Sequence, residues 1–145
     1  MKKKVYIINA NYYEEISKRL IAGAVNYLDE NQINYKIVNV LGALEIPTSI
    51  NLIYNRVFSK DFDIGFIGIG CIIRGETSHY DIVVNESAAG ITKLIMDKDI
   101  IITNSILTVE DKNQAIERSK NDKTNKGYHA AEACNQLLDI KNGKF

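Results

Sequence analysis

Four short runs rich in β-branched residues alternate along the chain with longer segments in which apolar residues recur every three or four positions. The runs span residues 4–9, 34–40, 64–69 and 99–106, and each has the length and composition of a β-strand. The third run, IGFIGI, is apolar throughout, which is typical of a central parallel strand covered on both faces. This alternation predicts right-handed crossovers and a four-stranded parallel sheet between two helix layers, a three-layer α/β/α sandwich.

The segments between these runs predict helices that each bury one apolar face. In the first of them, Ile16, Leu20 and Leu28 lie on the same side of a helix. The second begins near Leu44, and Pro47 is compatible with its first turn, where backbone amides have no intrahelical acceptor. Later helices are predicted at residues 80–96, 112–119 and 126–140.

Length and composition predict one globular domain that spans residues 1–145, because no linker or repeat divides the chain. The 18 basic and 18 acidic side chains give a formal net charge of +0, which argues against the basic face of a nucleic-acid-binding protein. No apolar stretch approaches the length that crosses a membrane. Cys71 and Cys134 lack the spacing of a metal site; one disulfide stays open as an alternative, but a reduced, cytoplasmic protein is the simpler prediction.

Parallel α/β sheets bind ligands at the carboxyl ends of their strands, so the loops that follow the four predicted strands are the places to search for a site. They span residues 10–13, 41–45, 71–79 and 104–108. A dinucleotide site is excluded, because the glycines at 68, 70 and 75 do not fit the G-x-G-x-x-G pattern and do not follow the first strand.

The loop that precedes the third helix combines hydroxyl side chains with a histidine. Backbone amides at a helix N-terminus, together with Thr77 and Ser78, could bind an anion, but an ordinary helix cap is the commoner arrangement and residue chemistry alone favours it. His79 could transfer a proton near neutral pH, or it could lie on the surface as part of the cap. Residue chemistry alone leaves both pairs of alternatives open.

Other candidates each have a structural alternative. Arg118 could clamp a phosphate or simply be solvated, and Glu45 and Asn104 could contact a ligand or cap a turn. Tyr12 could stack on a flat ring or pack against the protein, and Cys71 is interpreted as a small apolar residue at the end of a buried strand. Taken together, these residues predict an α/β domain whose pocket could hold an anion and a planar ring.

Four motifs in a fixed order resemble the lumazine synthase family along nearly the whole chain. They are GALEIP at 42–47, GCIIRGETSHYDIVVNESAAGI at 70–91, ILTVEDKNQAIERS at 106–119 and NKGYHAAEA at 125–133. The segment R-G-x-T-x-H followed by Y-D is the most specific of them. The resemblance implies a flavodoxin-like fold and an enzyme that joins 5-amino-6-(D-ribitylamino)uracil to 3,4-dihydroxy-2-butanone 4-phosphate. The resemblance implies no cofactor and no metal, and the reaction is the penultimate step of riboflavin synthesis.

The resemblance also assigns roles to residues at matching positions. His79 matches the histidine that transfers protons, and Arg118 matches the arginine that binds the phosphate with the amides of Glu76 and Thr77. Tyr12 matches an aromatic residue that stacks on the pyrimidine. The other matches contact the ribityl chain or border the pyrimidine: Leu44, Glu45, Cys71, Ile72 and Asn104.

Three positions depart from the family pattern. Leu41 replaces a proline that usually precedes the ribityl-binding turn, and Glu76 replaces a small residue beside the phosphate site, where its charge is expected to point away. Asp122 takes the position of a phosphate-binding lysine, with Lys123 next to it, so that contact is not expected here.

Assembly is also implied by the resemblance, because family active sites lie between adjacent subunits of a pentamer. A homopentamer is therefore expected, whereas a decamer, a sixty-subunit shell and association with riboflavin synthase stay open. Three other functions are alternatives: a binding module that only holds a flavin or lumazine, a shell subunit that encloses a partner, and an enzyme of the next step that dismutates lumazine. The presence of both His79 and Arg118 favours lumazine synthesis.

Overall fold

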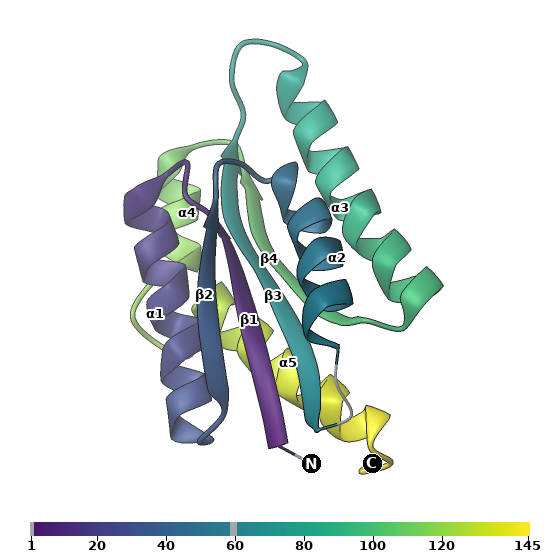
Figure 1. The fold of residues 1–145 in the computed structure, drawn as a ribbon. Coiled ribbons are helices and arrows are strands. Elements are labelled where there is room, and N and C mark those ends of the chain that lie inside the picture. The colour runs from purple at the N-terminus through teal and green to yellow at the C-terminus, as the bar shows by residue number, and fades with distance from the viewer. Residues whose placement is uncertain (1, 59–60) are drawn as a thin grey trace.

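The computed structural model describes residues 2–58 and 61–145, which contain one parallel sheet between two layers of helices (Figure 1). Its strands are β1 (Lys2–Ala10), β2 (Asn34–Val40), β3 (Phe62–Ile73) and β4 (Ile101–Val109), in the spatial order β2-β1-β3-β4. All three strand pairs are parallel. The predicted three-layer, flavodoxin-like sandwich with a four-stranded parallel sheet is confirmed.

Five helices cover the sheet in the described residues. They are α1 (Glu14–Glu30), α2 (Glu45–Val57), α3 (His79–Lys98), α4 (Lys112–Arg118) and α5 (Lys126–Lys141). Helices α1, α4 and α5 cover one face of the sheet, and α2 and α3 cover the other (Figure 1). The helix predictions are therefore confirmed to within a few residues at each end.

The core is divided by the sheet because successive strand residues point to opposite faces. Ile7 of β1 packs against the α1/α5 layer, whereas its neighbour Ile8 packs against the α2/α3 layer. In β3, residues 63–72 are all buried, which explains why this run is apolar on both faces. The packing is tight at Gly65, where an added Cβ atom would lie 2.6 Å from Sγ of Cys134.

Strands β3 and β4 have bounds that differ from the prediction, and the longer carboxyl ends of both strands affect the site. Asp99 takes the left-handed conformation (φ 54°) that ends α3, so β4 begins at Ile101 and not at residue 99. The strand then continues to Val109, which places Asn104 inside β4, opposite Gly68, and not in a loop. Strand β3 likewise runs to Ile73, beyond its predicted end at residue 69.

Helices α1 and α5 meet at a buried polar junction centred on Asn125. Its amide nitrogen donates to the carbonyl oxygens of Arg19 (3.1 Å) and Lys120 (2.9 Å). Its Oδ1 accepts hydrogen bonds from the backbone nitrogens of Gly127 and Tyr128 and so caps α5. At Gly127 the two helices approach so closely that an added Cβ atom would lie 1.9 Å from the carbonyl oxygen of Leu20.

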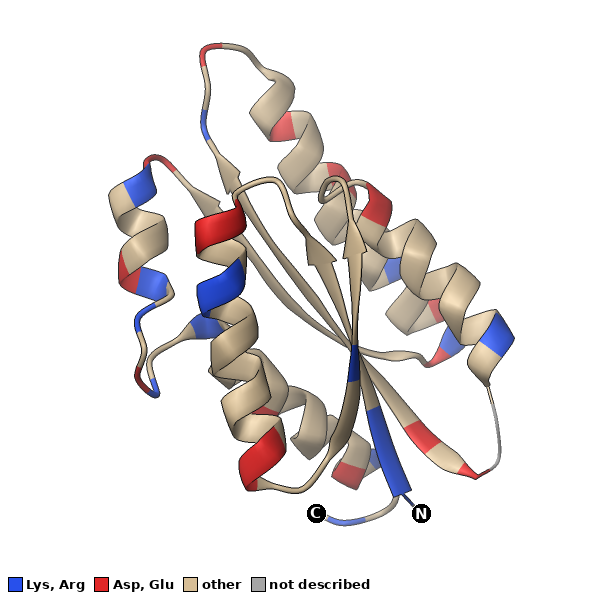
Figure 2. Ribbon diagram, turned by 60° about the vertical axis from the view of Figure 1, so that its left-hand side comes forward, with Lys and Arg blue, Asp and Glu red and all other residues tan. Residues whose placement is uncertain are grey.

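Charged residues of both signs lie on the helices, and in α1 acidic residues at both ends flank Lys18 and Arg19 (Figure 2). The ion pair between Lys3 and Asp139 joins the amino end of β1 to α5 at 2.6 Å. In the described part of the chain, no helix is both long and apolar enough to cross a membrane.

Candidate active site

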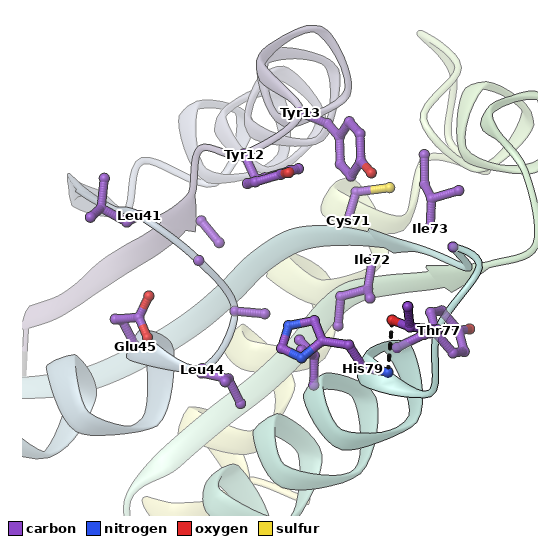
Figure 3. A pocket seen from close by; sticks show the side chains of 16 residues that line it. Tyr12, Tyr13, Leu41, Leu44, Glu45, Cys71, Ile72, Ile73, Thr77 and His79 are labelled. Atoms are coloured by element: carbon purple, nitrogen blue, oxygen red, sulfur yellow. Dashed lines mark hydrogen bonds between the residues drawn. The ribbon is translucent and has the colours of Figure 1, made fainter.

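A pocket of about 440 Å³ opens at the carboxyl edge of the sheet, between the loops that follow β1, β2 and β3 (Figure 3). This volume is within the usual range for a small-molecule site. The lining is mostly apolar, with a few polar groups that converge on the space. It consists of Ala10, Tyr12, Tyr13, Leu41, Gly42, Ala43, Leu44, Glu45, Cys71, Ile72, Ile73, Gly75, Thr77, His79, Tyr80 and Val83.

Two tyrosines from the β1–α1 loop form one wall of the pocket. The rings of Tyr12 and Tyr13 meet edge to face, with their centroids 4.9 Å apart. Tyr12 is 75% exposed, so the face of its ring is free to stack on a planar ligand. The loop is held to the next strand by the hydrogen bond from the backbone nitrogen of Asn11 to the carbonyl oxygen of Val40.

The last residues of β3 form the floor of the pocket. Cys71 and Ile72 are both buried there. Burial raises the pKa of the Cys71 thiol to about 11. Burial also raises the pKa of the Tyr13 phenol, and charge repulsion from Tyr12 and Cys71 raises it further. The thiol is therefore uncharged at neutral pH, which fits its interpretation as a small apolar residue and not as a nucleophile.

The turn before α2 places a carboxylate at the pocket. It is closed by hydrogen bonds from the backbone nitrogens of Glu45 and Ile46 to the carbonyl oxygens of Gly42 and Ala43, both 3.1 Å long. Glu45 is the first residue of α2, and its Oε1 lies 3.1 Å from the position where a Cβ atom of Gly42 would be. The small residue at position 42 thus leaves room for this carboxylate beside the turn.

The loop after β3 brings His79 to the opposite side of the pocket. His79 is the first residue of α3, as predicted, and its ring extends towards the segment that carries Leu44 and Glu45 (Figure 3). Its backbone nitrogen donates to Oγ1 of Thr77 at 3.3 Å, whereas Ser78 at the N-cap position makes no side-chain capping bond. Within residues 2–58 and 61–145, the amides of residues 76 and 77 donate no hydrogen bond, which leaves them available to a ligand.

A model of the 6,7-dimethyl-8-ribityllumazine synthase family matches residues 2–142. The chain belongs to this family. It is 43% identical over 143 residues to the 6,7-dimethyl-8-ribityllumazine synthase of Bartonella tribocorum, which covers 97% of the chain and 93% of that relative. The corresponding protein of Bartonella henselae is 42% identical over 140 residues (97% and 89% covered), and that of a Jannaschia species is 42% identical over 137 residues (94% and 74%).

The pocket gathers most of the residues that the resemblance to the lumazine synthase family singled out. They come from the three segments that follow β1, β2 and β3 or end β3, and they are Tyr12, Leu44, Glu45, Cys71, Ile72, Thr77 and His79. Three others, Glu76, Asn104 and Arg118, do not line the pocket. Glu76 is exposed in the loop between Gly75 and Thr77.

Asn104 and Arg118 lie outside the pocket of the same chain. Asn104 is exposed on β4, where its Oδ1 accepts a hydrogen bond from the backbone nitrogen of Ile106 at 2.8 Å. Arg118 is exposed at the end of α4, and its Nη1 donates to the carbonyl oxygen of Gln114 at 3.1 Å. In the described part of the chain β4 pairs only with β3, so Asn104 lies on an edge strand of the sheet, and Arg118 lies on α4, which packs against β4.

Several pocket residues were not predicted from the sequence. Val83 follows His79 by four positions, so helical spacing from His79 was the signal that could have found it, whereas Tyr80 is only one position on and has no such signal. Tyr13 and Ala43 adjoin predicted residues in their loops, but no pattern distinguishes them from ordinary packing. Within the described residues, no three His, Cys, Asp or Glu side chains are arranged to hold a metal ion, and Cys71 and Cys134 are both free thiols.

Proposed function

We propose that this member of the family forms 6,7-dimethyl-8-ribityllumazine from 5-amino-6-(D-ribitylamino)uracil and 3,4-dihydroxy-2-butanone 4-phosphate, the penultimate step of riboflavin synthesis. The observation that carries the proposal is the convergence of the family's motif residues on one cavity of about 440 Å³. In this reaction an amine of the pyrimidine condenses with the ketone to an imine and releases one water. Phosphate is then eliminated, and the second amine closes the ring with loss of a second water. Much of the acceleration comes from holding the two substrates together.

The pyrimidine substrate fits the apolar side of the pocket. The exposed ring of Tyr12 would stack on it, above the floor made by Cys71 and Ile72. The turn that carries Leu44 and Glu45 would hold the ribityl chain, with the carboxylate accepting hydrogen bonds from its hydroxyls. His79 reaches into the same space and would transfer protons during imine formation and elimination.

The phosphate group would bind at the loop before α3, where free backbone amides meet the start of a helix. The amides of Glu76 and Thr77 would contact it, and Arg118 of a second copy of the chain would complete the site. Asn104 is exposed on the edge strand β4 and Arg118 is exposed on α4, and neither lines the pocket of its own chain, which supports a site shared between copies.

A homopentamer is the assembly that the family implies, and we extend it to this protein. Sedimentation analysis would distinguish a pentamer from a decamer or a sixty-subunit shell, and mixing with riboflavin synthase would reveal association. We also propose that the protein acts in the cytoplasm, which its two free thiols support. The reaction needs no cofactor and no metal.

The proposal is tested by mixing the purified protein with both substrates and following the fluorescence of the lumazine product. The rate is compared with the uncatalysed reaction and with each substrate alone. Acceleration that requires both substrates is the expected result. A folded, oligomeric protein that leaves the uncatalysed rate unchanged would overturn the proposal and favour a binding module or a shell subunit.

A further inference from the structure

Arg74, the arginine of the R-G-x-T-x-H segment, connects three elements behind the pocket. Its backbone nitrogen donates to the carbonyl oxygen of Val109 at the end of β4, at 3.0 Å. Its side-chain Nε donates to Oε2 of Glu110 at 2.8 Å, and its Nη1 lies 3.6 Å from Oδ1 of Asp81 in the first turn of α3. The arginine therefore ties the end of β3 to the end of β4 and to the start of α3.

The guanidinium of Arg74 also covers an aromatic ring of the pocket wall. It lies 4.3 Å from the ring centroid of Tyr80, within the range of a cation–π contact. Tyr80 lines the pocket, but Arg74 does not, so the arginine contacts the wall from outside. The hydrogen bond that Arg74 donates to Glu110 raises the pKa of the guanidinium further above the physiological range, in which an arginine is always charged.

The loop between β3 and α3 has few other attachments. It projects beyond the carboxyl edge of the sheet (Figure 1), and nothing lies within 4 Å of the position of an added Cβ atom at Gly75. Within residues 2–58 and 61–145, hydrogen bonds join residues 75–78 only to the first turn of α3, where the backbone nitrogens of His79 and Asp81 donate to Oγ1 of Thr77 and to the carbonyl oxygen of Ser78. The placement of His79 relative to the turn at Glu45 therefore depends on how Arg74 holds the two ends of this loop.

We propose that Arg74 is a positioning residue, which orients His79 and the amides of residues 76 and 77 by fixing the loop to Glu110 and to the first turn of α3. This inference rests on the proposed function, because it concerns the same site. Lysine cannot replace the arginine fully, since a single ammonium group cannot bond Glu110 in a fixed direction and also lie flat over Tyr80.

The test compares kcat, KM and melting temperature for Arg74→Gln, Arg74→Lys and a matched control, Arg19→Gln. Arg19 is also in a surface ion pair, with Glu15, and its side chain is 41% exposed against 43% for Arg74. Arg74→Gln is expected to lower kcat by about five- to tenfold, and Arg74→Lys to recover part of that loss. The melting temperatures of Arg74→Gln and Arg19→Gln should be similar, because both remove only exposed contacts.

A double-mutant cycle with Glu110→Gln shows whether the arginine acts through its carboxylate partner. The double variant should be no slower than Arg74→Gln alone, because the two changes remove the same attachment. The inference is overturned if Arg74→Gln keeps the kcat of Arg19→Gln, or if the two losses multiply. If Arg74→Gln does not fold, Glu110→Gln alone tests the inference, and an unchanged kcat in that variant overturns the inference. An inactive wild-type protein would instead overturn the proposed function, so the two failures are distinguishable.

Discussion

The segment between α4 and α5 and the loop between β3 and α3 are both polar, but they are held in opposite ways. Asn125 ends the first segment and is buried, and each of its polar side-chain atoms bonds to the backbone. The second is held at its base by Arg74, whose side chain is 43% exposed. The first segment thus stabilises the packing of α1 on α5, whereas the second leaves backbone amides free at the pocket.

This difference shows how the fold separates stability from function. Buried polar groups must be satisfied within the protein, so the α1–α5 junction has a single arrangement and contributes to the scaffold. A loop that binds a ligand must keep donors unpaired, and it is therefore less firmly held. Substitutions at the α1–α5 junction should therefore lower stability, whereas substitutions at the loop between β3 and α3 should lower activity.

The largest effect is expected for Gly127→Ala at the α1–α5 junction. The added methyl group would lie 1.9 Å from the carbonyl oxygen of Leu20, so the helices must move apart at a cost of about 3 kcal/mol or more. Urea unfolding would measure the loss. Gly75→Ala is the matched control, because nothing lies near its added methyl group, and it should change stability by less than about 0.5 kcal/mol. Equal losses would contradict the comparison.

Unlike Gly127→Ala, His79→Ala should cause a large loss of activity and little loss of stability. The side chain is exposed at the pocket, and removal of a proton-transfer group is expected to lower kcat about a hundredfold. Binding of the butanone phosphate should largely survive. His129→Ala, on the exposed side of α5, provides the control and should leave kcat unchanged. A melting temperature that falls as steeply as for Gly127→Ala would argue for a structural role of His79.

Arg118→Ala should have a smaller effect, chiefly on KM for the butanone phosphate. Loss of one charge-assisted contact to the phosphate is expected to raise KM about tenfold, with a lesser change in kcat. Steady-state kinetics at saturating pyrimidine would separate the two constants. If His79→Ala and Arg118→Ala damaged kcat and KM in the same proportion, the division into proton transfer and phosphate binding would be wrong.

The smallest effect concerns the pH dependence of stability. Burial raises the pKa of Cys71 from 9.0 to about 11, so between these pH values the folded state keeps a proton that the unfolded state has released. Stability should therefore fall as the pH rises above 9, by about 1 kcal/mol from pH 8 to pH 10. Cys71→Ala should remove that part of the decline and leave the contribution of Cys134, whose pKa burial raises to about 12. Parallel profiles for the two proteins would contradict this assignment.

The fold was predictable because apolar periodicity distinguishes strands from helices, and the order of elements leaves few topologies. The start of β4 was not predictable from the sequence, because the left-handed conformation of Asp99 depends on how α3 ends against the sheet. The pocket residues were predictable in part, since loops at the carboxyl ends of parallel strands must converge. Neither the distance of Arg118 from the pocket nor the contact at Gly127 has a signature in the sequence, because both depend on how α4 and α5 pack.

The strand order also has a consequence for synthesis on the ribosome. Strand β1 lies between β2 and β3, so the first of these four strands to be made is paired along both edges in the folded sheet. One edge can pair once residue 40 has emerged, but the other faces Phe62–Ile73 and stays open until about 30 further residues have been added. An open apolar edge of this kind can pair with a neighbouring chain. A chaperone bound to β1 would prevent such pairing until Phe62–Ile73 has been made.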